Sequence, residues 1–429
     1  KAIYIFLFII SQSFFAQQNN QLWKGYFSYN EIVDVESSTN AVFASTQNAL
    51  FSQVVASSNL NVYNSITGLK PDVITTIHHS DAFNKTFVGN NNGLILIQNA
   101  DGSVTTKVDV IEEVPVPPNK KKINDFFEFN GRLYIATDYG ISVIDIATSE
   151  FISTYFIGTS GEETEVLQTT VFNNEIYAVT RSFGIRKANL NNPNLFDFSQ
   201  WQTFDAGFWF GIVTFNNQLI ATNANARTYR FNGGTAFEIL NHNQAGLKLK
   251  TNGTELIVTT QNNVYVLNQS FSILAHITQI PNFTVRFTSA SVVGGIIYIG
   301  TEKEGLFSTS LSNPTVFTAM SPNGPLQNST FRLKKATNKI WVVHGDYSQS
   351  FNPYPLDELG ISTFTADQGW DVIPYSDLSG AKSLSDIAIN PSNQNQVYVT
   401  SYFSGLLKMF GNTIELFNNT NTGANGLES

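Results

Sequence analysis

The amino-acid sequence predicts an all-β fold, and within that class a β-propeller of four-stranded antiparallel blades. Three observations lead to this prediction. A short hairpin motif recurs along the chain, and each copy is flanked by further strand-like segments. Phenylalanine is abundant (35 residues) and methionine is nearly absent (2), which favours sheets over helices. Apolar residues also lack the 3.6-residue period of an amphipathic helix.

The clearest copy of the motif covers residues 133–144. It predicts two strands, 133–136 and 141–144, joined by a turn at Tyr139 and Gly140. Short runs of β-branched and aromatic residues between Gly, Asn and Asp are typical of β-hairpins.

The copies align on one apolar residue, the anchor residue, which we place in the second strand of each unit. The nine anchor residues, 37 to 57 positions apart, are Phe43, Phe87, Tyr134, Tyr177, Ile220, Ile257, Tyr298, Trp341 and Tyr398. In most units a glycine or a small substitute follows six or seven residues later, at Ala49, Gly93, Gly140, Gly184, Ala226, Asn263, Gly305 and Gly405. A tight hairpin often needs positive φ, which costs glycine and asparagine least.

Other segments complete each unit. Strand-like segments precede many anchors, for example at 32–35, 73–77 and 123–127, and a more polar fourth segment such as 150–155 follows. Four strands in about 40–45 residues is the period of a propeller blade. A parallel β-helix has a shorter period and a row of immunoglobulin-like domains a longer one. The dipeptide Trp370-Asp371 does not recur, so the WD40 signature is missing.

The spacing also predicts two domains. The first seven anchors are almost evenly spaced, which predicts a seven-bladed first propeller over 17–320, with residues 22–27 as a closing outer strand. The eighth unit has a long Pro/Ser/Asp-rich stretch after Trp341, and the ninth recovers the pattern. We therefore expect 321–429 to form the first blades of a second, truncated propeller. A single ring of eight or nine blades is the alternative.

The N-terminus has the pattern of an export signal. Lys1 precedes an apolar run, 2–10, and a polar stretch begins at Gln17, so we expect a signal peptide over 1–16 that is cut after Ala16. A buried first strand is the alternative. We expect no transmembrane segment in the mature chain, because no other run is long and apolar enough. The chain lacks an initiator Met and its repeat still runs near Ser429, so we expect a fragment of a longer protein.

Composition excludes several classes of function. The formal charge of −9 and the pI near 5.1 argue against a nucleic-acid partner. The absence of cysteine rules out disulfides, zinc–thiolate sites and a cysteine nucleophile. Phosphate-binding glycine motifs and EF-hand loops are absent too, so no cofactor is expected.

We predict no catalytic, cofactor-binding or metal-binding residue, no enzymatic activity, and no particular binding residue. The histidines lack metal-ligand spacing, and adjacent ones point to opposite faces of a strand, so surface or edge positions are favoured. They are His78, His79, His242, His276 and His344. A glycosidase would need facing carboxylates, but the acidic pairs lie in loop-like segments and favour solvated charge. These pairs are Glu112-Glu113, Glu162-Glu163 and Asp357-Glu358.

Two further groups of residues were weighed as functional sites. Ser160, in Gly158-Thr159-Ser160-Gly161, lacks the glycine spacing of a nucleophile elbow, so a loop is predicted. Residues 208–210 (Phe-Trp-Phe) and Trp370 could form an aromatic binding surface, although packing between blades is favoured in a chain so rich in Phe.

The start of the mature chain resembles the PorZ family of the Bacteroidetes type IX secretion system. The family opening matches at Trp23, Tyr26, Tyr29, Asn30, Asp34 and Val35. The late unit at 387–407 also resembles that family, and equally the broader two-component-regulator propeller repeats.

The resemblance implies two seven-bladed propellers followed by a C-terminal β-sandwich, which this chain does not reach. It also implies an exported protein, in the periplasm or at the cell surface, attached peripherally to the outer membrane. The implied partners are the PorU sortase and the outer-membrane proteins PorV and PorQ, and the implied ligand is anionic lipopolysaccharide. Two alternatives remain: a periplasmic sensor propeller of a hybrid two-component regulator that binds oligosaccharide, and a propeller glycosidase or lyase.

Overall fold

The computed structural model describes residues 24–57, 59–345, 347–423 and 427. They form nine four-stranded sheets, in each of which neighbouring strands are antiparallel and follow chain order. Three short 3₁₀ helices lie in the loops: η1 (Pro118–Lys120), η2 (Phe198–Gln200) and η3 (Tyr375–Asp377). The predicted all-β architecture of four-stranded antiparallel blades is confirmed.

The strands of the first four sheets are β1 (Asp34–Ser37), β2 (Ala41–Ser45), β3 (Leu50–Val54), β4 (Leu60–Tyr63); β5 (Ile74–Ser80), β6 (Lys85–Asn90), β7 (Ile95–Gln98), β8 (Val104–Lys107); β9 (Ile123–Phe129), β10 (Arg132–Thr137), β11 (Ile141–Asp145), β12 (Phe151–Tyr155); β13 (Val166–Phe172), β14 (Glu175–Thr180), β15 (Gly184–Asn189) and β16 (Gln202–Asp205). The next three sheets comprise β17 (Trp209–Phe215), β18 (Gln218–Asn223), β19 (Arg227–Asn232), β20 (Thr235–Asn241); β21 (Gly246–Thr251), β22 (Leu256–Thr260), β23 (Val264–Leu267), β24 (Ile273–Ile277); β25 (Phe287–Val293), β26 (Ile296–Thr301), β27 (Leu306–Ser310) and β28 (Asn313–Ala319). The last two sheets comprise β29 (Arg332–Lys335), β30 (Ile340–Val343), β31 (Ile361–Thr365), β32 (Gly369–Ile373); β33 (Leu384–Ile389), β34 (Gln396–Ser401), β35 (Leu406–Phe410) and β36 (Thr413–Phe417).

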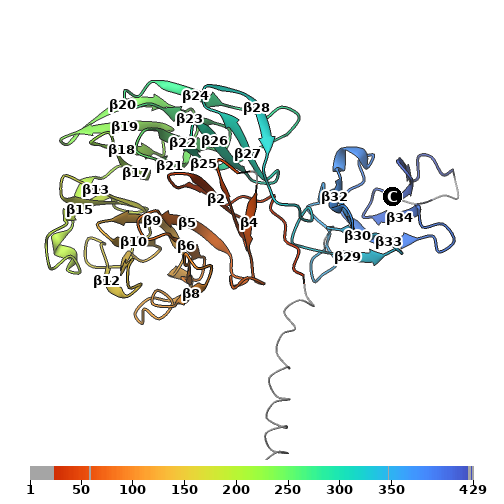
Figure 1. Ribbon diagram of the computed structural model, residues 1–429, viewed down its shortest axis with the longest axis horizontal. Helices are drawn as coiled ribbons and strands as arrows, with labels where there is room; N and C mark the ends of the chain where they lie inside the picture. Colours follow the sequence, from red (N-terminus) through yellow and green to blue (C-terminus); the bar gives the residue numbers. More distant parts are fainter. Residues whose placement is uncertain (1–23, 58, 346, 424–426, 428–429) are drawn as a thin grey trace, which may run out of the picture.

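The sheets of β1–β28 close into a ring (Figure 1). The first strand of each sheet is the innermost, and these strands contact one another in the order β1, β5, β9, β13, β17, β21 and β25, with β25 back against β1. The remaining two sheets, the two-sheet unit, lie beside the ring. The division of the chain into domains at residue 320 remains a prediction.

All nine anchor residues lie in the second strand of their sheet, as predicted. Glycine is required at some of the positions that follow the anchors, both because of the backbone conformation there and because a side chain would clash. Gly184 and Gly405 have φ of +66° and +109°, and a Cβ on either would overlap the carbonyl oxygen of a residue in the fourth strand, Asp205 or Phe417. Only glycine lets the two segments approach so closely.

Turns between first and second strands carry a signal that the alignment on anchors did not use. Four of them have two adjacent residues with positive φ, the geometry of a type I′ hairpin turn. They are Asn130-Gly131, Asn173-Asn174, Asn216-Asn217 and Gly294-Gly295.

The core lies between neighbouring sheets, so each blade buries both faces. Tyr134 and Val143 of the third sheet pack with Ile176 and Ala178 of the fourth, for example. The first and seventh sheets share such a cluster, so apolar packing closes the ring. The two-sheet unit has a core of its own, which includes Trp341.

Residues 24–27 form no strand, so the predicted closing outer strand over 22–27 is wrong for its described part. Backbone hydrogen bonds from the segment before β1 join the first and seventh sheets instead: Ile32 N donates to Thr301 O at 2.9 Å, and Gly305 N donates to Asn30 O at 2.8 Å. The predicted signal peptide, 1–16, lies outside the described residues. No helix in the described part of the chain is long and apolar enough to cross a membrane.

Candidate functional site

The ring axis is the strongest candidate site. Each innermost strand presents an unpaired backbone edge to the axis, and such an edge needs polar partners. Two adjoining cavities lie there, of about 250 Å³ and about 400 Å³. Both are lined by Asp125, Gln168 and Leu249, which therefore mark the neck between them. We call the two cavities together the channel.

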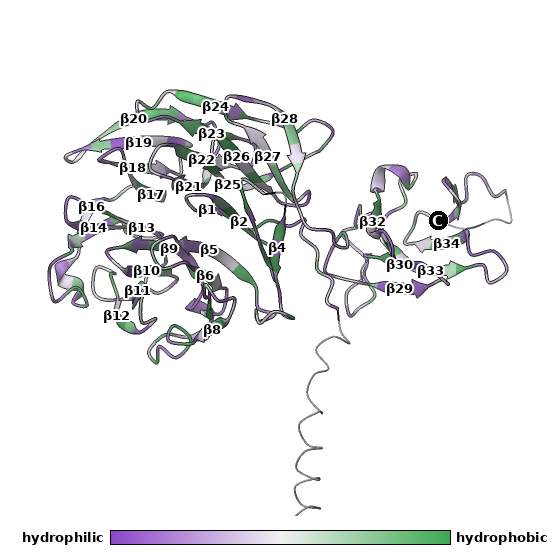
Figure 2. Cartoon of the chain, in the orientation of Figure 1, coloured by the Kyte–Doolittle hydropathy of each residue, from purple (hydrophilic) through white to green (hydrophobic). Residues whose placement is uncertain are grey.

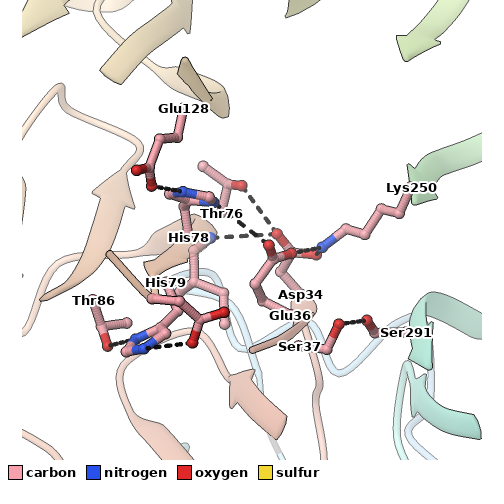
Figure 3. A network of polar contacts seen from close by, with 12 residues as sticks. Asp34, Glu36, Ser37, Thr76, His78, His79, Thr86, Glu128, Lys250 and Ser291 are labelled. Carbon is pink, nitrogen blue, oxygen red and sulfur yellow. Dashed lines mark hydrogen bonds and ion pairs between the residues drawn. The ribbon is translucent and has the colours of Figure 1, made fainter. Parts of the chain in front are cut away.

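Asp34 is the fully buried centre of the polar network in the channel (Figure 3). Its carboxylate contacts Lys250 Nζ at 2.8 Å and accepts hydrogen bonds from Thr76 Oγ1 at 3.0 Å and Ser289 Oγ at 2.8 Å. Burial alone would raise the pKa of Asp34, but the charges of Lys248 and Lys250 hold it well below its usual range. Asp34 is therefore ionised at neutral pH.

Lys250 completes this network across the axis. Besides Asp34, its Nζ contacts Glu36 Oε2 at 3.0 Å and donates to Val35 O at 2.6 Å. Burial alone would lower the pKa of Lys250, yet the two carboxylates raise it. Because β21 and β1 belong to sheets that are not neighbours, Lys250 ties the sixth blade to the first through the axis.

His78 lies between two carboxylates. Its Nε2 is 3.1 Å from Glu128 Oε2, and its Nδ1 is 3.5 Å from Glu36 Oε1. Burial alone would lower the pKa of His78, but the hydrogen bonds and charges of Glu128 and Glu36 raise it to about 9. His78 is therefore a cation at neutral pH and links the first, second and third blades.

The Asp125 side chain lies at the neck between the two cavities. Among the described residues its carboxyl forms no hydrogen bond and no close ion pair, although the charges of Lys248 and Lys250 act on it. Burial raises the pKa of Asp125 to about 6, against the opposing attraction of Lys248 and Lys250. This carboxyl is the side chain in the channel most available to a ligand.

The larger cavity opens at the ends of the inner strands where they begin. We call this the channel mouth, and its charged and aromatic lining is Lys122, Glu165, Arg181, Phe210 and Lys248. Arg181 pairs with Glu165 at 2.9 Å and lies over the Phe210 ring at 5.6 Å from its centroid. The Lys122 ammonium forms no ion pair or hydrogen bond with another described side chain, although its charge acts on Asp138. The mouth thus offers cations and an aromatic face to a ligand.

The prediction of surface or edge histidines is wrong for His242 and His344, which are buried: His242 contacts Thr222, and His344 contacts Ser362 Oγ at 2.8 Å. His78 and His79 are half-buried, and His276 is exposed. His79 points away from the channel and stacks on Phe43, so adjacent histidines do face opposite ways. Sequence reasoning missed these partners because they come from distant segments. Among the described residues, no group of three or more acidic or histidine side chains could hold a metal ion.

The acidic pairs lie in loops and do not face one another across a shared cleft. Glu113 accepts from Thr154 Oγ1 at 2.8 Å, Glu163 pairs with Lys120 at 3.0 Å, and Glu358 pairs with Lys382 at 2.5 Å. Ser160 lies in a turn, as predicted, and its backbone N–H donates to Glu162.

Some of the aromatic candidates are packed against other side chains, and others are accessible. Trp209 is buried, and its Nε1 donates to Asp205 at 2.8 Å, so the packing interpretation is confirmed for this residue. Trp370 packs against Tyr26 and Phe364. Phe208 is 76% exposed, and Phe210 lines the channel mouth, so these two remain available for binding.

Residues 42–202 match the family model described as the N-terminal β-propeller domain of PorZ from the type IX secretion system. No curated protein is matched by this sequence. The chain is also similar to a solved structure of PorZ from Porphyromonas gingivalis, described as an essential bacterial surface component of that system. The TM-score is 0.79 at 16% identity, over 94% of this chain and 54% of that one.

Two other solved structures share the fold at lower similarity. One is the extracellular domain of the hybrid two-component system BT3049 from B. thetaiotaomicron, with a TM-score of 0.53 at 14% identity over 89% of this chain and 51% of that one. The other is a chain of the mitotic checkpoint complex, with a TM-score of 0.51 at 12% identity over 66% and 88%. The present chain spans about half the length of the first two structures. The predicted resemblance to the PorZ family is therefore confirmed over residues 42–202, which match the model of that family's N-terminal propeller domain.

Proposed function

We propose that this protein is an exported, non-enzymatic β-propeller scaffold of type IX secretion that acts like PorZ in attaching cargo at the cell surface. The observation that carries the proposal is the family match over residues 42–202. The similar course of the backbone over 94% of the chain supports it. The protein would lie in the periplasm or at the surface, attached peripherally to the outer membrane, with PorU-, PorV- and PorQ-like partners.

We further propose that the channel mouth is where this scaffold binds anionic lipopolysaccharide. The Lys122 ammonium forms no ion pair within the described part of the chain, and the Phe210 ring, with Arg181 over one face, lines the same mouth. Cations with aromatic faces suit an acidic glycan, because charge and stacking act together. No enzymatic step is invoked, since the acidic pairs lie in separate loops.

Affinity capture tests the scaffold proposal. A tagged full-length chain, crosslinked in intact cells and purified from the envelope, should recover the PorU-, PorV- and PorQ-like proteins. Recovery of none of them would overturn it.

Titration of purified chain with anionic lipopolysaccharide tests the ligand. Lys122→Gln should weaken binding several-fold, whereas Lys334→Gln, an exposed cation on β29, should leave it unchanged. Equal affinities for both variants would exclude the channel mouth.

The second candidate is the periplasmic sensor propeller of a hybrid two-component regulator, which the fold shared with the extracellular domain from B. thetaiotaomicron favours. Tight binding of a neutral oligosaccharide, together with failure to capture the secretion partners, would support this candidate over the first.

A further inference from the structure

A segment without regular structure lies between the ring and the two-sheet unit. We call residues 24–30 the strap; in Figure 1 they belong to the dark red chain that runs between the two bodies and leads to β1. The strap is hydrogen-bonded or packed on both sides. Irregular segments are commonly more mobile than the strands they connect, so an attachment on both sides needs an explanation.

The C-terminal part of the strap is held by the ring. Asn30 O accepts from Gly305 N at 2.8 Å, and Tyr29 O accepts from Ser321 Oγ at 3.2 Å. The Tyr29 side chain is buried and meets Phe51 edge to face, with 5.8 Å between ring centroids.

The N-terminal part of the strap is held by the two-sheet unit. The Tyr26 ring lies 4.9 Å from the Phe364 ring and 5.5 Å from the Trp370 ring, measured between centroids. Phe364 is in β31 and Trp370 in β32, so Tyr26 sits on the eighth sheet.

Between these two attachments the strap runs beside the chain that connects the ring to the two-sheet unit. Ser28 N donates to Asn328 Oδ1 at 2.8 Å, and Ser28 Oγ donates to Leu326 O at 2.8 Å. A Cβ on Gly324 would overlap the Phe27 carbonyl oxygen, so the two segments can lie this close only because residue 324 is glycine.

We propose that the strap fixes the orientation of the two-sheet unit relative to the ring, and that the Tyr26 ring attaches the strap to the eighth sheet. Two bodies joined by a single connection are expected to move relative to each other unless the interface is large. The strap adds a second connection from a part of the chain about 300 residues away, Ser28 to Asn328. The ring and the two-sheet unit therefore behave as one rigid body, independently of the secretion role.

Distance measurement between two spin labels tests this directly. The chain has no cysteine, so Thr106→Cys on the ring and Asn412→Cys on the ninth sheet give two unique labels at exposed positions. In the full chain, pulsed electron paramagnetic resonance should give one narrow distance distribution. Tyr26→Ala removes the aromatic contact with the eighth sheet, and Gly324→Ala displaces the strap at Phe27 and Tyr29 while leaving the Tyr26 ring in place. Each should lose the single narrow peak and show a broad distribution.

Gly234→Ala is the matched control, because a Cβ there meets no atom within 4 Å and the backbone needs no positive φ. It should keep the narrow peak. Circular dichroism and thermal melting establish that both strap variants keep their folded sheets. A narrow and unchanged distribution in folded Tyr26→Ala and Gly324→Ala would overturn the proposal.

Discussion

The ring and the two-sheet unit are built from the same four-stranded blade but differ in the surroundings of the first strand. In the ring this strand faces the axis, and its side chains join a buried polar network around Asp34 and Lys250. In the two-sheet unit all four residues of β29 are exposed, and Figure 2 shows this strand as hydrophilic. A blade is therefore a local property of the sequence, whereas the axial network exists only where blades meet around a common centre.

Among substitutions of polar residues, the largest expected effect comes from the buried centre of the axial network. Asp34→Ala leaves Lys250 with one carboxylate fewer, and we expect a loss of about 3 kcal/mol in the free energy of unfolding of the ring. Urea unfolding followed by tryptophan fluorescence measures this loss. Asp367→Ala, at an exposed turn of the two-sheet unit, is the control and should change little. Similar losses in both variants would remove the distinction between the two regions.

A pH-dependent effect should follow from His78. Its folded pKa of about 9 lies above the ordinary value of 6.5, so the folded state binds the proton more tightly. Protonated His78 therefore contributes about 2–3 kcal/mol to the free energy of unfolding below about pH 6.5. This contribution is lost as the pH rises through 9. The advantage of the parent over His78→Gln in unfolding free energy should therefore shrink from pH 6 to pH 10. If the difference in unfolding free energy between the parent and His78→Gln stays constant across this range, His78 is not a cation held by its two carboxylates.

At the neck of the channel we expect a smaller effect, and here the substitution should stabilise the fold. Burial raises the pKa of Asp125 to about 6, so the folded parent loses stability as the pH rises from about 4 through 6. Asp125→Asn removes this penalty and should raise the free energy of unfolding at pH 8 by about 1 kcal/mol. The gain should disappear below about pH 3, where the carboxyl is protonated in both states. A variant less stable than the parent at pH 8 would mean that Asp125 has a favourable partner.

The smallest effect should come from the exposed first strand of the eighth sheet. Leu333→Ala removes a side chain that is 52% exposed, and we expect a change within about 0.5 kcal/mol. Ile77→Ala, in β5 of the ring, should cost about 2–5 kcal/mol because Ile77 is buried. Thermal melting of both variants measures the contrast, and equal costs would show that β29 is covered in solution.

The blades could be predicted because their signals are local. Phe43, Tyr134 and Tyr398 each identify a second strand through their immediate neighbours, and a glycine such as Gly405 marks the turn that follows. The type I′ turns, such as Asn130-Gly131, would have fixed the first strands more sharply had they been included in the alignment.

The site could not be predicted in the same way. His78 looked like an isolated histidine, since its partners Glu36 and Glu128 come from other blades. Lys250 meets Asp34 only because the ring closes, and no sequence spacing encodes that distance. The contacts of the strap could not be predicted for the same reason, because the partners of Tyr26 lie far along the chain.

A deletion strain tests the proposed PorZ-like role in type IX secretion. We would delete the gene, fractionate the cells, and locate by mass spectrometry the cargo proteins that carry the C-terminal secretion signal. We expect cargo to accumulate unprocessed and to disappear from the cell surface, and the intact gene to restore its display. Cargo that is processed and displayed normally in the deletion strain would rule out this role.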